Sequence, residues 1–165
     1  MKSLLTLICA AAALCLSAVP AAQARIDVRV RGEGAKAFTV ADKGTSQFIL
    51  HPKWMQMKNL DGAQVLLKLN GTDWQTDTFS LTAGSAGQLY INVMGPDVRD
   101  PETKKRIEAW VDYQKIVVNG KVVFEAKDGK VLSVWHDKSK SFLVIKNLKE
   151  GETVKFEVTS RPSAK

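Results

Sequence analysis

Short segments rich in Val, Ile, Phe and Thr recur along the chain, and Gly, Asn or Asp residues separate them. In the run from Val117 to Val123, Asn119-Gly120 stands between two apolar pairs. This dipeptide favours a type I′ hairpin turn, because both of its residues adopt positive φ. No stretch keeps the helical apolar period of about 3.6 residues over three turns. The sequence therefore predicts an all-β fold built from hairpins.

The strands expected from this pattern are short and closely spaced. They cover residues 26–30, 37–40, 46–50, 64–69, 78–81, 88–93, 107–118, 122–125, 131–135, 141–145 and 153–159. The last of them alternates apolar with charged residues, so one of its faces should be core. Residues 95–106 are polar and include two prolines, which indicates a long surface loop. The pattern predicts a two-sheet antiparallel β-sandwich of the jelly-roll type, while an immunoglobulin-like strand order stays open.

The N-terminus has the form of a cleavable secretory signal. Lys2 precedes an apolar run from Leu4 to Val19, and Ala22-Gln23-Ala24 has the small-x-small pattern that signal peptidase cuts. Both cysteines lie inside this segment. We therefore expect a signal peptide over residues 1–24 and a single domain over 25–165, exported to the periplasm or the cell exterior. No later segment is apolar enough to span a membrane.

The chain is basic, with a formal net charge of +7. A positive balance favours acidic partners such as acidic polysaccharide or anionic lipid headgroups. Lys and Glu are interspersed, however, which is also typical of an ordinary solvated surface. We expect no nucleic-acid partner.

Two segments resemble galactose-binding-like jelly rolls and related carbohydrate-binding modules. The first runs from Asp73 to Gly84 and continues into Gly87–Val93, with a Trp before an alternating strand and a Gly turn after it. The second is Ala109–Tyr113 followed by Ile116–Lys121. Together they cover about Asp73 to Lys121. The family usually carries Asn or Asp where Tyr113 stands, so the resemblance implies the fold more than it implies an activity.

Trp110 is the main candidate for a ligand-binding residue. Strand alternation puts it on one face with Asp112 and Gln114, while Ile107, Val111 and their neighbours face the other way. A ring among amide and carboxylate groups is what a sugar platform requires. The competing interpretation is a strand that is buried on both faces or bulged near Lys115.

The other three tryptophans have weaker signals. Trp74 follows a turn-like segment and could lie at the rim of the sandwich, or it could fill the core. Trp54, between His51 and Met57, stands where methionines could form an adaptable apolar surface, although packing beneath a loop is the alternative. Trp135 opens a polar connection and could cap the sandwich end or contribute to a site, of which we favour capping. The predicted ligand-binding residues are Trp110, Asp112, Gln114 and Trp74.

Catalytic and metal chemistry has little support in the sequence. A zinc site would need His51 and His136 to meet with a carboxylate, and we predict none. Asp97, Asp100 and Glu102 could hold calcium, but basic neighbours favour a solvated loop. No Ser or Cys has a recognisable nucleophile context. We expect no enzyme activity and no cofactor.

The sequence therefore predicts an exported, non-catalytic binding module for carbohydrate or polysaccharide, with an acidic glycan as one option. The alternative is a structural or assembly component of the cell envelope that binds another protein. An enzyme acting on envelope polymers is a third class, which would require two carboxylates facing each other across a cleft.

Overall fold

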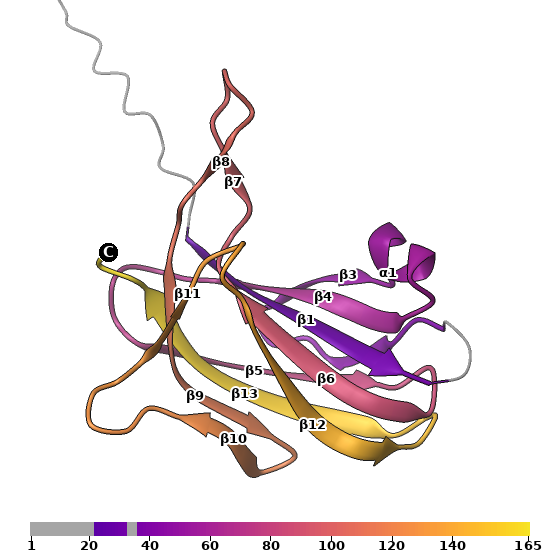
Figure 1. Cartoon of the computed structure of the whole chain (residues 1–165). Coiled ribbons are helices and arrows are strands. Elements are labelled where there is room, and N and C mark those ends of the chain that lie inside the picture. Colours follow the sequence, from indigo (N-terminus) through magenta and orange to yellow (C-terminus); the bar gives the residue numbers. More distant parts are fainter. Residues whose placement is uncertain (1–21, 33–35) are drawn as a thin grey trace, which may run out of the picture.

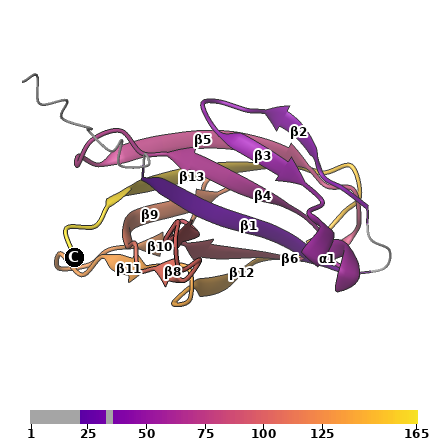
Figure 2. The same ribbon diagram turned by 90° about the horizontal axis from the view of Figure 1, so that it is seen from above.

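The computed structural model describes residues 22–32 and 36–165 of the chain. Two antiparallel sheets face each other as the layers of a sandwich (Figures 1 and 2). In spatial order, sheet A contains β12 (Lys140–Leu148), β6 (Gly87–Met94), β1 (Gln23–Arg31), β4 (Asp61–Lys68) and β3 (Gln47–Leu50). Sheet B contains β10 (Lys121–Glu125), β9 (Val111–Val118), β13 (Thr153–Pro162), β5 (Gln75–Thr82) and β2 (Thr39–Asp42), with β11 (Leu132–Val134) also paired to β9. The predicted all-β antiparallel sandwich is confirmed.

Two local features differ from the expectation. The range 95–106 is not simply a loop, because β7 (Val98–Arg99) pairs with β8 (Arg106–Ile107) in a small hairpin that projects from the sandwich (Figure 1). A one-turn helix, α1 (Lys53–Met57), follows β3 in a segment that was expected to contain no helix. Five residues are too few for a helical period to appear in the sequence.

The predicted turns have the expected backbone. Asn119 and Gly120 have φ values of 49° and 75°, and they join β9 to β10. Asp128 and Gly129 repeat the pattern with φ values of 52° and 71°. A left-handed backbone costs glycine little and Asn or Asp less than other residues, which explains why these dipeptides end the strands.

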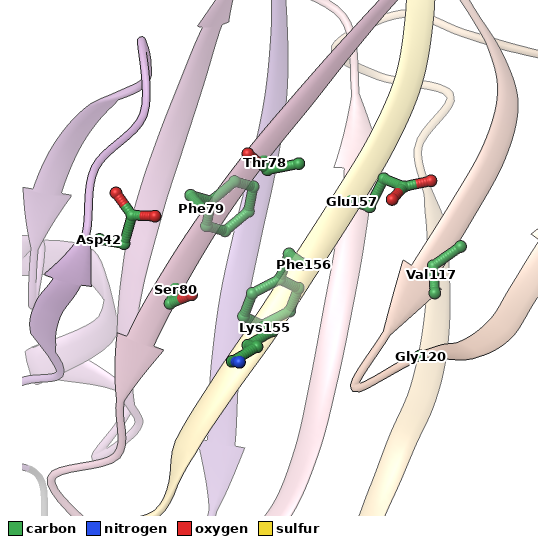
Figure 3. Close-up of a pocket in the computed structure, with 9 residues that line it drawn as sticks. All are labelled: Asp42, Thr78, Phe79, Ser80, Val117, Gly120, Lys155, Phe156 and Glu157. Carbon is green, nitrogen blue, oxygen red and sulfur yellow. The ribbon is translucent and has the colours of Figure 1, made fainter.

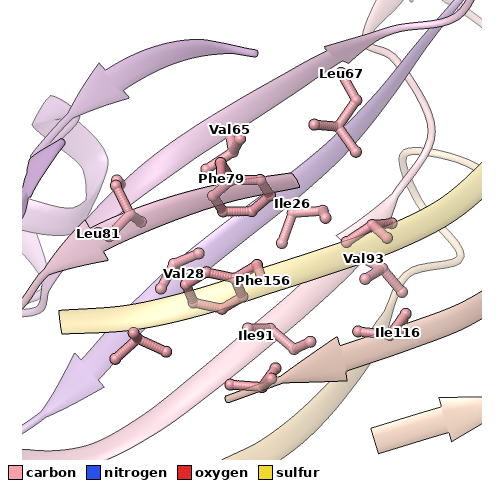
Figure 4. Packing of buried hydrophobic residues seen from close by; sticks show 14 of the residues in the cluster. Ile26, Val28, Val65, Leu67, Phe79, Leu81, Ile91, Val93, Ile116 and Phe156 are labelled. Carbon is pink, nitrogen blue, oxygen red and sulfur yellow. The ribbon is translucent and has the colours of Figure 1, made fainter. Parts of the chain in front are cut away.

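Strand β1 shows how alternation builds the core. Ile26 and Val28 point between the sheets and are fully buried, whereas Arg25 and Arg29 point away from them. The apolar faces of the other long strands do the same, so a single cluster fills the space between the layers (Figure 4). The predicted core face of β13 is confirmed by its buried apolar residues, Val154, Phe156 and Val158.

The predicted signal segment lies almost wholly outside the described residues, which begin at Ala22. Strand β1 starts at Gln23, so Gln23 and Ala24 pair with Lys68 and Leu67 of β4. The predicted cleavage before Arg25 would remove these two residues from the strand.

Tyr113 is the largest fully buried side chain in the core. Its hydroxyl donates a hydrogen bond to the Met94 carbonyl at 2.9 Å, and the Arg25 carbonyl is 3.3 Å away. Burial raises the pKa of the Tyr113 hydroxyl far above its ordinary value, because the phenolate would lose its hydration.

We expect this burial to make the protein sensitive to alkali. Above a pH of about 10 the unfolded tyrosine ionises while the folded one does not, so stability falls by up to about 1.4 kcal/mol per pH unit. Tyr113→Phe should lack this contribution, although it loses about 1 kcal/mol at neutral pH with the hydrogen bond. Urea unfolding of both proteins from neutral to alkaline pH measures the difference. Parallel pH profiles would contradict the prediction.

Candidate functional site

Trp110 lies just before β9, whose first residue, Val111, pairs with Pro162 at the end of β13, close to the C-terminus. Its ring is half-buried, and its indole Nε1 donates a 2.7 Å hydrogen bond to Glu108 Oε1. The Nζ atoms of Lys138 and Lys165 lie 5.4 and 4.9 Å from the ring centroid. The centroid of Trp135 is 6.4 Å away, with the two ring planes tilted by 42°. Trp110 therefore combines an aromatic face, a carboxylate and two cations.

Arg161 links two of the other predicted residues. Its guanidinium carbon lies 4.2 Å from the ring centroid of Trp74, and its Nε is 3.5 Å from Asp112 Oδ2. Arg161 and Asp112 are cross-strand partners of β13 and β9, which fixes this proximity. Ser133 on β11 donates a 2.6 Å hydrogen bond to Asp112 Oδ1. The carboxylate of Asp112 is thus held by two neighbours, and only 6% of its side chain is exposed.

A hollow of about 300 Å³ adjoins Arg161. It is lined by Thr72, Asp73, Arg161, Pro162, Ser163 and Ala164. The Ser163 amide donates a 3.0 Å hydrogen bond to the Trp110 carbonyl, which ties the C-terminal segment to the strand that follows Trp110. We call this region the tryptophan end, and define it by Trp74, Trp110, Trp135, Lys138, Arg161 and Lys165.

Gln114 lies at a break in the strand pairing. In the pairing of β13 with β9, Tyr113 and Lys115 have partners on β13 and Gln114 has none. Because of this extra residue, Tyr113 and Ile116 both face the core although they are three residues apart. The bulge considered at this position is confirmed. Gln114 is exposed on the outer side of sheet B, where its backbone carbonyl accepts a hydrogen bond from the Ala126 amide.

The expected strand over residues 107–118 is interrupted. Ile107 belongs to β8, where it pairs with Val98, and it is 44% exposed rather than in the core. Trp110 lies on the segment between β8 and β9. Of the four predicted residues, Trp74 and Asp112 both contact Arg161. Trp110 is connected to them by the C-terminal segment, which follows Arg161 and bonds to the Trp110 carbonyl. Gln114 has no part in these contacts.

A network of charges fixes the loops beside Trp135. Arg106 donates to Asp97 and to Asp137, each at 2.7 Å, and His136 Nδ1 is 2.9 Å from Asp137. The hydrogen bond from Arg106 lowers the pKa of Asp97, and the same bond raises the pKa of Arg106. These contacts join the base of the β7–β8 hairpin to the turn that carries Lys138.

Backbone packing also requires a glycine here. A Cβ at Gly95 would lie 2.5 Å from the Ala109 carbonyl oxygen and 3.0 Å from the Trp135 Cα. Only glycine allows the segment after β6 to pass between the segments that precede Trp110 and contain Trp135.

The residues considered for metal binding have other contacts. His51 precedes α1 and His136 follows β11, and these two elements lie at opposite ends of the sandwich (Figure 1). Asp97 pairs with Arg106, and Asp100 Oδ1 accepts hydrogen bonds from the Glu102 and Thr103 amides. Among residues 22–32 and 36–165, no group of three acidic, His or Cys side chains has an arrangement suited to a metal ion.

A second hollow, of about 330 Å³, lies on the outer face of sheet B (Figure 3). Asp42, Thr78, Ser80, Lys155 and Glu157 line it together with Val117 and Gly120, so its walls mix polar and apolar groups. The rings of the two phenylalanines beneath it point into the core and are almost fully buried. This hollow therefore presents no exposed phenylalanine ring to a ligand.

Several residues of the tryptophan end were not predicted as ligand contacts. Arg161 and Lys165 have no distinguishing local pattern, because their role depends on where the end of β13 lies relative to Trp74 and Trp110. Trp135 and Lys138 lie in the polar connection that was expected to cap the sandwich, and Trp135 does pack there against Trp110.

No protein-family model, curated protein or solved structure matches the chain. What the structure supports of the resemblance to galactose-binding-like jelly rolls is the fold class, an all-β, two-sheet antiparallel sandwich.

Proposed function

We propose that this chain is a non-catalytic binding module for carbohydrate, with its site at the tryptophan end. The observation that carries the proposal is the partly exposed side chain of Trp110 beside the Glu108 carboxylate. An indole ring supplies a flat apolar surface for the C–H face of a sugar, and carboxylates accept hydrogen bonds from its hydroxyls. The hollow lined by Asp73, Arg161 and the C-terminal segment provides room for a second sugar unit.

The cations of this end favour an acidic glycan. Lys138, Arg161 and Lys165 all lie against tryptophan rings. The two lysines are exposed, so each ammonium can leave the Trp110 ring and pair with a carboxylate or sulfate group while the sugar takes its place. The guanidinium of Arg161 suits a planar carboxylate, although Asp112 already occupies part of it.

Export is part of the same proposal. Residues 1–24 have the pattern of a cleavable signal, which would deliver the domain to the periplasm or the cell exterior, where acidic polysaccharides are accessible.

The test is a panel of neutral, uronic-acid-containing and sulfated polysaccharides, with binding followed by calorimetry. We expect binding to one acidic class, and we expect Trp110→Ala to weaken it at least tenfold, because truncating a central aromatic anchor costs about 2 kcal/mol. Lys138→Gln with Lys165→Gln should weaken acidic glycans more than neutral ones and reduce the salt dependence of binding.

The matched control is Lys146→Gln with Lys149→Gln, which removes the same charge from exposed positions at the far end of β12. This control should bind as the unchanged protein does. Absence of binding across the panel, or equal losses in the two double variants, would contradict the proposal.

A second candidate function is binding of another envelope protein. The edge strands β10 and β12 border a hollow of about 480 Å³, and Val122 and Leu143 beside it are 46% and 42% exposed. Unpaired strand edges with apolar side chains can accept an extended peptide. A stable complex in which a partner covers both residues would favour this function.

A further inference from the structure

Exposed apolar side chains gather at one corner of the sandwich. Ile49 and Leu50, at the end of edge strand β3, are 46% and 41% exposed, and Met57, the last residue of α1, is 74% exposed. These are three of the six large apolar residues that are exposed in the described part of the chain. We call this surface the β3–α1 corner, and define it by Ile49, Leu50, Lys53, Trp54, Met57 and Lys58.

The core holds this corner in place. Met55 of α1 is fully buried over sheet A, where a Cβ at Gly62 would lie 2.6 Å from its sulfur atom. The backbone amide of His51 bonds to the Gly62 carbonyl at 2.8 Å, and the Gln56 side chain donates to the His51 carbonyl at 2.7 Å. Anchored in this way, α1 keeps Met57 in solvent instead of folding it against the sheet.

The charge of the corner has one sign. Residues 47–60, which include β3 and α1, contain Lys53 and Lys58 and no Asp or Glu. The next acid along the chain, Asp61, is fully buried, and burial raises the pKa of its carboxyl group. Asp61 therefore presents no carboxylate to the solvent beside these lysines.

Trp54 of α1 adds an aromatic ring to the β3–α1 corner. It is half-buried, and the ammonium of Lys58 lies 6.0 Å from its ring centroid. An indole flanked by lysines and beside exposed aliphatic and thioether side chains is typical of segments that rest in the headgroup region of a bilayer.

We propose that the β3–α1 corner docks on the surface of an anionic lipid bilayer. Apolar side chains would enter the headgroup boundary, and the lysines would pair with anionic headgroups. In the described part of the chain, no helix is long and apolar enough to cross a bilayer.

The positive charge of the β3–α1 corner favours a lipid surface over a second copy of the chain as the partner that covers it. A two-fold contact between two copies of the corner would bring Lys53 and Lys58 of both copies close together, which opposes association. An anionic surface instead neutralises them. The inference is independent of glycan binding, because α1 and the C-terminus lie at opposite ends of the sandwich in both views (Figures 1 and 2).

The test uses vesicles of equal parts phosphatidylglycerol and phosphatidylcholine, with pure phosphatidylcholine as the neutral comparison. Co-sedimentation should show binding to the anionic vesicles that weakens with added salt. Lys53→Gln with Lys58→Gln should lower the partition coefficient roughly 30-fold. The matched control, Lys127→Gln with Lys130→Gln on the exposed turn after β10, should lower it less than threefold.

A second readout locates the contact. Hydroxyl-radical oxidation of Met57 should slow when anionic vesicles are added, whereas Met57 should oxidise at the same rate with neutral vesicles. Equal losses of binding in the two lysine pairs, unprotected Met57, or dimerisation that protects Met57 without lipid would each overturn the proposal. Trp110→Ala should bind vesicles normally, so failure of the glycan site is distinguishable from failure here.

Discussion

Replacement of Phe79 by alanine is expected to lower the free energy of unfolding by about 4 kcal/mol. Phe79 is 1% exposed and lies at the centre of the core (Figure 4). Its ring stacks on Phe156 with a centroid distance of 4.8 Å and an interplanar angle of 12°, and the edge of Phe48 approaches at 5.8 Å. Alanine would leave a cavity between strands of both sheets, which the rigid ladders cannot close.

The matched control is Phe79→Leu, which keeps most of the apolar volume and should cost about 1 to 2 kcal/mol. Both values come from urea unfolding with fluorescence and circular dichroism as independent probes. A loss below about 1 kcal/mol for Phe79→Ala would mean that the ring is not packed as described.

Replacement of Arg161 by leucine should destabilise the fold by about 2 kcal/mol. The cost comes mainly from Asp112, whose nearly buried carboxylate would lose its counter-charge while Ser133 remains its donor. Trp74 would lose the guanidinium that lies 4.2 Å from its ring centroid. Because 36% of the Arg161 side chain is exposed, solvent screening keeps the loss below that of a fully buried pair.

A double-mutant cycle isolates this interaction. Asp112→Asn combined with Arg161→Leu should cost at least about 1 kcal/mol less than the sum of the two single changes. Arg161→Lys is the charge-retaining comparison, and it should recover only part of the stability, because an ammonium lacks the planar face that stacks on Trp74. Strict additivity would show that Asp112 does not depend on Arg161.

The fold class could be predicted because its signals are local. Asn119-Gly120 and Asp128-Gly129 require positive φ, and alternation in β13 separates its core face from its solvent face. The missed helix α1 and the missed β7–β8 hairpin are both very short. Each is held by contacts with other segments, such as Met55 over Gly62, and such contacts leave no periodic pattern in the sequence.

The candidate site was only partly predictable. Alternation correctly put Val111 and Tyr113 in the core, but it failed at Ile107, because pairing with Val98 removes Ile107 from the strand that contains Tyr113. Asp112 was expected beside Trp110 on an open face. It faces outward from the core but is covered, because the register between β9 and β13 brings Arg161 over it.

The order of amino acids by itself determined where the chain turns and which side of each long strand is apolar, because these properties depend on the backbone preferences and side chains of neighbouring residues. Only the packed sandwich decided that Arg161 reaches both Trp74 and Asp112, that Lys165 lies over Trp110, and that the lysines of α1 stand beside exposed apolar side chains. These contacts depend on strand register and on the paths of segments that are distant in sequence. Both are fixed by the packing of the whole core.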